Sequence, residues 1–352
     1  MTNSALELTD SPYPPSWIDR LIHWIEGLPG PSWLYYLVGL IVSLVIVNGV
    51  FWLDGSLAVG TFHSLPSSYA PWIVYWPALY HYLTRVASRA LHAYRPLLES
   101  SAGELGRIEY QLTVLPRGVG AWLIPIASLS ATAFVLGSVD SYGELAPRTA
   151  LHIVADIPFT SAMSASFLAL AVRSVRQLLQ VSRLHWQARN IDLLHLKPAY
   201  AFSQLTARTG IGLVFILLIA YTQESFALGS QVLDTVSLVA NILVVILAVA
   251  IFLLPIMSMQ DRLEEEKDRQ MRENSLVLEA ARHRIHNQVH ENDYQDTKGS
   301  LDAIAALIQE RQLLEKVSTW PWDPRTLRGF SSALLLPIFL WLVIRLLERF
   351  LQ

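Results

Sequence analysis

Long runs of apolar residues alternate with shorter polar segments along this chain. Four runs, 33–53, 118–138, 151–172 and 235–257, are each about 20 residues long and almost entirely apolar. Three weaker runs, 71–84, 209–223 and 329–344, have shorter apolar cores, but helix-compatible sequence flanks each of them. A helix of about 20 residues crosses a hydrocarbon layer roughly 30 Å thick. The pattern therefore predicts an all-α, polytopic membrane protein with about seven transmembrane helices.

Composition supports this class and excludes several others. Hydrophobic residues make up 53% of the chain and charged residues 16%, whereas about a quarter of an ordinary soluble domain is charged. The chain has no cysteine, which excludes disulfides, thiolate nucleophiles and cysteine-ligated metal centres. The first ten residues are polar and lack the pattern of a cleavable signal, so we expect the first span to direct insertion.

The basic residues predict the orientation of the spans. If all seven runs cross, the segments on one side of the membrane carry 23 of the 26 Lys and Arg residues. Because basic loops resist translocation, that side and the N-terminus are expected to be cytoplasmic. Arg345 and Arg349 follow the short seventh run. Two alternatives remain for the seventh run. It either crosses the membrane fully, with these arginines at the outer interface, or forms a re-entrant or interfacial helix.

Four parts follow from this map. Residues 1–32 form a cytoplasmic N-terminus, 33–257 a six-helix transmembrane bundle with cytoplasmic extensions, 258–318 a cytoplasmic helical hairpin, and 319–352 a connector and the terminal helix. In the first part, apolar residues recur at helical spacing: Trp17, Leu21, Leu28 and either Trp24 or Ile25. This pattern predicts a short interfacial helix anchored by tryptophan, with a partner-binding helix as the alternative.

The segment 258–318 has the features of an antiparallel hairpin. No Gly or Pro interrupts more than 30 residues after Ser258, a run of turn-forming residues follows, and Ser300 caps a second helix. A narrow apolar stripe on the first helix, Leu278, Ala281, Ile285 and Val289, is typical of a coiled-coil seam. We expect the hairpin to anchor an oligomer, or alternatively to dock a partner protein.

A connector rich in Trp and Pro joins this hairpin to the last run. Its residues are Trp320, Pro321, Trp322, Pro324, Arg325 and Arg328. Tryptophan favours the membrane interface, and proline prevents one continuous helix. The connector is therefore expected to be a stiff coupler that fixes the angle between the hairpin and the terminal helix.

Catalytic and cofactor motifs are absent from the sequence, so we expect no enzyme activity, no cofactor and no nucleic-acid partner. His283, His286 and His290 share one helical face, with acidic residues just beyond. That spacing suits a divalent metal, but a solvated or subunit-facing helix surface is the preferred interpretation. No metal site is therefore predicted.

Polar and aromatic residues of the predicted spans gather in their outer halves. They are Asn48, Trp72, Tyr75, Trp76, His152, Asp156, Tyr221 and Asn241. His152 and Asp156 are four residues apart and close enough to pair, and an acidic residue inside a span is a functional candidate. These residues predict either an outward-facing pocket for a small organic ligand or ordinary interhelical hydrogen bonds with an aromatic belt.

The order of elements resembles the superfamily of seven-helix ion channels that includes insect odorant and gustatory receptors. The resemblance is one of topology over nearly the whole chain. The insect signature of Thr-Tyr, five apolar residues and Gln-Phe is missing from "GFSSALLLPIFLWLVIRLLERF" at 329–350. The resemblance implies four subunits joined mainly by the hairpin, a ligand in the outer half, and a central cation pore lined by the last helix.

On this resemblance, the pore-lining residues here would be Ser332, Leu336, Phe339 and Val343. The alternative is that this stripe packs against the fifth or sixth span. The sequence thus favours a homo-oligomeric, ligand-gated cation channel, tetrameric by analogy, in a prokaryotic inner membrane, surrounded by lipid. A non-conducting sensor or scaffold is the alternative. A transporter is disfavoured because the sequence has no internal repeat.

Overall fold

The computed structural model describes residues 11–138, 150–189, 191–227, 235–290, 297–322 and 324–351. The regular elements of these residues are all helices, and Pro15 and Pro116 form an isolated bridge. The elements are α1 (Trp17–Glu26), α2 (Ser32–Asp54), α3 (Ser64–Tyr94), η2 (Arg95–Leu97), α4 (Ala102–Thr113), α5 (Arg117–Ser138), α6 (Ala150–Gln187), α7 (Ala201–Ala227), α8 (Thr235–His290), α9 (Thr297–Lys316) and α10 (Pro324–Leu351). The prediction of an all-α protein is confirmed.

Among the residues that the structure describes, three helices are long and apolar enough to cross a membrane. They are Ser32–Asp54 in α2, Arg117–Gly137 in α5 and His152–Gln187 in α6. The other predicted runs are also helical: 71–84 lies in α3, 209–223 in α7, 235–257 in α8 and 329–344 in α10. A membrane protein is therefore supported, whereas the number of spans stays a prediction.

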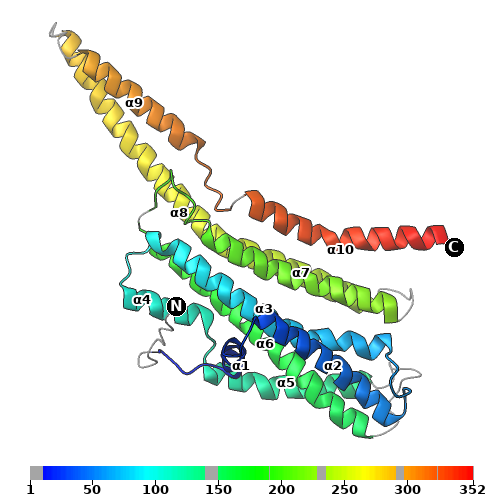
Figure 1. The fold of residues 1–352 in the computed structure, drawn as a ribbon. Helices are drawn as coiled ribbons and strands as arrows, with labels where there is room; N and C mark the ends of the chain where they lie inside the picture. The colour runs from blue at the N-terminus through cyan, green and yellow to red at the C-terminus, as the bar shows by residue number, and fades with distance from the viewer. Residues whose placement is uncertain are drawn as a thin grey trace.

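The helices form a bundle from which one pair extends. In the bundle α5 packs on α6, α2 on α3, and α3 on both α6 and α7 (Figure 1). The long helix α8 packs on α6 and α7, continues past Pro255, and carries α9 back along its distal part. The last helix, α10, runs alongside α7 at the edge of the bundle.

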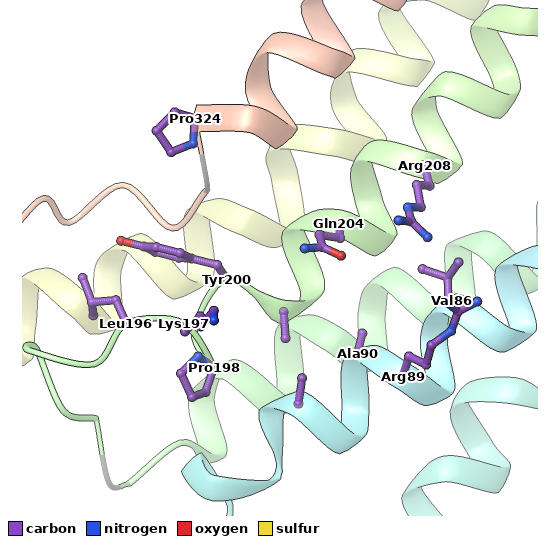
Figure 2. A pocket seen from close by; sticks show the side chains of 12 residues that line it. Val86, Arg89, Ala90, Leu196, Lys197, Pro198, Tyr200, Gln204, Arg208 and Pro324 are labelled. Carbon is purple, nitrogen blue, oxygen red and sulfur yellow. The ribbon is translucent and has the colours of Figure 1, made fainter.

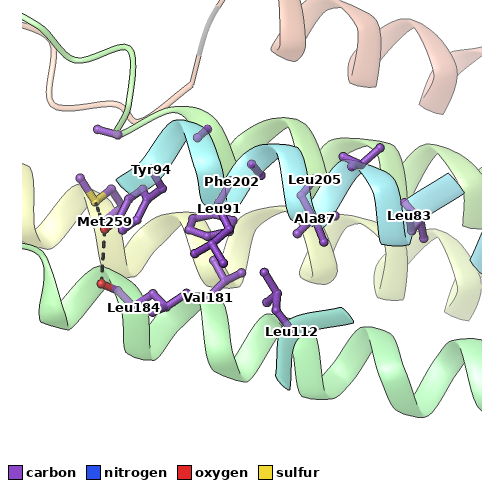
Figure 3. Packing of buried hydrophobic residues seen from close by; sticks show 14 of the residues in the cluster. Leu83, Ala87, Leu91, Tyr94, Leu112, Val181, Leu184, Phe202, Leu205 and Met259 are labelled. Carbon is purple, nitrogen blue, oxygen red and sulfur yellow. Dashed lines mark hydrogen bonds between the residues drawn. The ribbon is translucent and has the colours of Figure 1, made fainter. Parts of the chain in front are cut away.

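A packed core joins α3, α6, α7 and α8 at the end of the bundle from which the hairpin of α8 and α9 extends. Leu91, Val181, Phe202 and Met259 are all almost fully buried there (Figure 3). Tyr94 lies among them, with its hydroxyl 3.4 Å from the carbonyl oxygen of Leu184. Because side chains from four helices fill this core, it fixes the base of α8 against the bundle.

His185 adds a polar contact between α6 and α8. Its Nδ1 lies 2.9 Å from the carbonyl oxygen of Pro255 and 2.9 Å from Oγ of Ser258. Both His185 and Ser258 are buried. The contact therefore holds α8 at the position of its internal proline.

The face of α1 that packs on the bundle differs from the predicted stripe. Ile18, Ile22 and Ile25 are buried, whereas Trp24 is 62% exposed. The pattern allowed two registers because isoleucine and tryptophan are both apolar. The isoleucine face prevails because it packs into the core shared with α3, α4 and α5, leaving Trp24 outside.

Candidate functional site

The first turns of α10 pack on α7 and α8. The ring of Phe330 is 5% exposed, and its centroid lies 4.2 Å from that of Phe252 in α8. Gly210 in α7 permits this approach, because a Cβ there would lie 2.7 Å from the Phe330 ring. The packed face of α10 is thus the one that carries Leu327 and Phe330.

The predicted pore stripe lies on a different face of α10. Ser332 is exposed, Leu336 is 43% exposed, Phe339 is 63% exposed, and Val343 is half-buried. Ser332 is two residues from Phe330, which places it about 200° around the helix. Within this chain Ser332, Leu336 and Phe339 are therefore exposed to lipid or another subunit.

The coupler stacks its aromatic rings in series. The ring of Trp320 stacks on Trp322 with centroids 4.7 Å apart, and Trp322 stacks on Phe252 at 5.8 Å. Pro321 is buried, α10 begins at Pro324, and Arg325 and Arg328 are exposed on its first turn. The stacked rings connect the segment after α9 to α8, on which the first turns of α10 pack.

Polar contacts close the hairpin of α8 and α9. Asn274 is buried, and its Nδ2 donates to the carbonyl oxygen of Leu307 at 3.1 Å and to Glu310 Oε2 at 3.0 Å. Lys267 Nζ donates to the carbonyl oxygens of Glu315 and Val317. Large apolar side chains nevertheless stay exposed on the hairpin: Leu276, Val277, Leu301, Ile308 and Leu313.

Most of the predicted ligand-pocket residues join helices to one another. Asn48 is fully buried, and its Nδ2 donates to Leu44 O at 2.9 Å and Ser67 Oγ at 3.0 Å. Trp76, which stacks on Trp72 within α3, also contacts Phe167 of α6, with centroids 4.8 Å apart. The hydroxyl of Tyr75 donates to the carbonyl oxygen of Gly212 at 2.7 Å. Tyr221 and Asn241 lie in α7 and α8, but their side chains lie outside the described residues.

The structure places an acidic group beside His152 that the sequence analysis missed. Nδ1 of His152 lies 3.5 Å from Oδ2 of Asp54 at the end of α2, and both side chains are buried. The ring of Phe51 meets His152 edge-on at 4.3 Å. No local sequence signal could identify this pair, because its members are far apart along the chain.

The space around Asp156 is small. Two cavities of about 20 Å³ each border its side chain, one reaching Tyr69 and the other His152. Each cavity has room for about one water molecule. Among the described residues around Asp156, each of these two cavities is thus too small for an organic molecule.

The histidines of α8 show no metal-binding arrangement among the described residues. His283 is 3.9 Å from Glu279, and the rings of His286 and His290 lie 5.6 Å apart. In the part of the chain that the structure describes, no group of three His, Cys, Asp or Glu side chains could hold a metal. The acidic residues at 291–296 lie outside that part.

A second feature that sequence analysis missed is a buried arginine. Arg173 of α6 is 4% exposed, its guanidinium lies 4.0 Å over the ring of Tyr80, and it donates to the Tyr80 carbonyl oxygen at 2.9 Å. The Tyr80 hydroxyl in turn donates to Asp19 of α1 at 2.7 Å. The sequence analysis used Arg173 only as a basic residue that predicts orientation, and its buried contact with Tyr80 could not be inferred from that.

Comparisons with models of protein families, with curated proteins and with solved structures find no match for this chain.

Proposed function

We propose that this chain is one subunit of a homo-oligomeric cation channel, with seven spans and a cytoplasmic N-terminus. The terminal helix α10 crosses the membrane and lines the pore through Ser332, Leu336, Phe339 and Val343. The single observation that carries the proposal is the division of α10 into two faces. One face packs on α7 and α8, whereas Ser332, Leu336 and Phe339 are exposed on another.

The exposed apolar side chains of the hairpin support assembly of several copies. Leu314, Asn274 and Lys267 lie in contacts between α8 and α9, whereas Leu276 and Leu301 stay more than half exposed. Burying such side chains against another copy is favourable at about 25 cal/mol per Å² of apolar area removed from water. Four copies agree with the resemblance described above.

Gating follows from the apolar character of the proposed pore. Rings of Leu336 and Phe339 would form a hydrophobic constriction that blocks ions by losing its water. A small organic ligand between the outer halves of the helices would open the channel. Because the cavities beside Asp156 are about 20 Å³ each, ligand entry requires separation of α2, α3 and α6.

A non-conducting scaffold is the second candidate. The same exposed residues of the hairpin, Leu276 and Leu301 among them, favour it, because they could dock another protein instead of a second copy. In that case α10 faces lipid and the pore does not exist.

Native mass spectrometry of the detergent-purified protein separates the two functions. We expect a tetramer that dissociates to monomers in a Leu276→Glu, Leu301→Glu variant. The matched control is Leu194→Glu, which changes an exposed leucine of the segment before α7, outside both the hairpin and the predicted spans. A clean monomer for the unmodified chain would contradict the channel and favour the scaffold.

A further inference from the structure

One cavity of the described structure has no part in the proposed pore or ligand pocket. Its volume is about 640 Å³, and it lies between α3, the segment before α7, the first turns of α7 and the start of α10 (Figure 2). Pro324 of the coupler forms one side of it. A molecule in this cavity would therefore contact the coupler and two bundle helices at once.

Three basic side chains line the cavity from three segments. Arg89 comes from α3, Lys197 from the loop and Arg208 from α7. Figure 2 shows Arg208 directed from α7 toward the part of α3 that carries Val86 and Arg89. The described residues that line the cavity include no carboxylate. The described lining residues therefore carry a positive charge and contribute no negative one.

The structure already orients two of these cations. Nε of Arg89 donates to the carbonyl oxygen of Arg85 at 3.1 Å. The guanidinium of Arg208 lies 5.7 Å from the centre of the Tyr82 ring. No described carboxylate forms an ion pair with Arg89, Lys197 or Arg208. Guanidinium groups that keep donors available bind phosphate oxygens well, because two N–H groups can contact two oxygens together.

The remaining lining is apolar or neutral. Small and aliphatic side chains such as Ala90, Ala93 and Leu196 cover part of the wall, and Gln204 adds an amide. The cavity also lies where two predicted spans, 71–84 and 209–223, end in basic residues. Basic cavities at that level of a membrane protein suit anionic headgroups.

We propose that this cavity binds a phosphate-bearing anion through Arg89, Lys197 and Arg208. The phosphate group belongs either to the headgroup of an anionic lipid or to a soluble compound with several phosphates. Both sources offer the same oxygens to the same three cations. The inference goes beyond the proposed channel and applies equally to a scaffold, because it concerns binding alone.

The test measures binding to the full-length, detergent-purified chain by native mass spectrometry. One titration uses phosphatidylglycerol, with phosphatidylcholine as the zwitterionic control, and a second uses sodium tripolyphosphate. We expect an Arg89→Gln, Arg208→Gln variant to bind the anion about tenfold more weakly. Lys197→Glu, a change of one exposed loop residue, should weaken binding similarly without affecting the fold.

The matched control is Arg107→Gln, Arg183→Gln, which removes the same charge from exposed positions outside the cavity. Binding of phosphatidylglycerol that only the cavity variants weaken identifies a lipid headgroup. If tripolyphosphate binds, phosphatidylglycerol does not, and only the cavity variants weaken that binding, the ligand is a soluble compound. Equal losses in the control and cavity variants, or binding of neither probe, would overturn the proposal.

Discussion

At the scale of single residues, buried polar groups hold the helices in register. Asp54 and His152 show this, because they connect α2 to α6 through a contact of 3.5 Å with both side chains buried. Removing one of the two side chains leaves the other buried without its polar neighbour, which lowers the free energy of unfolding by about 1–3 kcal/mol. An exposed pair such as Asp192 and His195 lacks that cost because water solvates the remaining group.

Asp54→Ala is accordingly expected to lower the stability of the protein by about 1–3 kcal/mol. Asp192→Ala, which removes the exposed partner of His195, should cost less than about 1 kcal/mol. The measurement is thermal unfolding in detergent, followed by tryptophan fluorescence. Equal melting temperatures for the two variants would mean that the buried contact adds nothing to stability.

Gly210 offers a second residue-scale prediction. Its Cβ would meet the Phe330 ring at 2.7 Å and the backbone oxygen of Ala248 at 3.1 Å. Because a backbone atom cannot give way easily, Gly210→Ala should destabilise the contact of α10 with α7 by about 1–3 kcal/mol. Gly49→Ala in α2 is the control, since no atom lies within 4 Å of the added Cβ. The same melting experiment should show no loss for Gly49→Ala; no loss for Gly210→Ala would disprove the close packing of α10.

At the scale of elements, α1 is held by its ends as well as by its isoleucine face. Ser16 caps the helix together with Asp19, which also accepts from Tyr80 and from the amide of Leu115. At the other end Glu26 lies 2.9 Å from His81 Nε2 and 3.2 Å from Arg85 Nη2 of α3. Helix α1 therefore also links α3 to the start of α5.

The contact of Glu26 predicts a pH dependence. Burial by itself would raise the pKa of this carboxyl, but hydrogen bonds from His81 and Arg85 outweigh burial and lower the pKa below 4.5. A carboxyl with a lowered pKa in the folded state stabilises the fold above its ordinary pKa, and this stabilisation is lost as pH falls through the folded value. The charged Glu26 thus supports the docking of α1 at neutral pH and stops doing so in acid.

The test compares melting temperatures from about pH 7 down to about pH 3.5. The unmodified chain should lose more stability below the ordinary carboxyl pKa than Glu26→Gln, which lacks the titrating group. Glu99→Gln, which changes an exposed carboxylate 3.5 Å from Arg189, should behave like the unmodified chain. Identical pH profiles for all three proteins would refute the role of Glu26.

At the scale of the whole molecule, the proposed pore depends on the position of α10. It lies at the edge of the bundle and packs on α7, so four copies could bring their exposed stripes to one axis. The absence of cysteine from the chain makes this arrangement easy to test. A single introduced thiol can form a disulfide only with its counterpart in another subunit.

Ser332→Cys is expected to form disulfide-linked dimers after mild oxidation in the membrane. Leu129→Cys, at a position 75% exposed on α5, serves as the control and should stay monomeric. The products are read on a non-reducing gel. Cross-linking at Leu129 but not at Ser332 would place a different face of the molecule at the subunit contact.

Sequence patterns could predict the helices but not most contacts between them. The apolar runs identified the helical segments because length and periodicity are local properties. The sequence left open whether Trp24 or Ile25 faces the bundle, because both are apolar, and only the packing of the bundle decides that Ile25 is buried. The partner of His152 and the cavity around Arg208 could not be predicted, since each is formed by segments that meet only after folding.

The continuity of α8 has a mechanical consequence. From Pro255, where His185 holds it to α6, the helix continues to His290, a distance of about 50 Å at 1.5 Å per residue. The part of α8 beyond Pro255 can therefore move as a rigid rod that pivots near the bundle. A tilt of about 5° at the proline displaces the far end by roughly 4 Å. Small rearrangements among α6, α7 and α8 would thus become large movements at the tip of the hairpin, where distances between attached spin labels can record them.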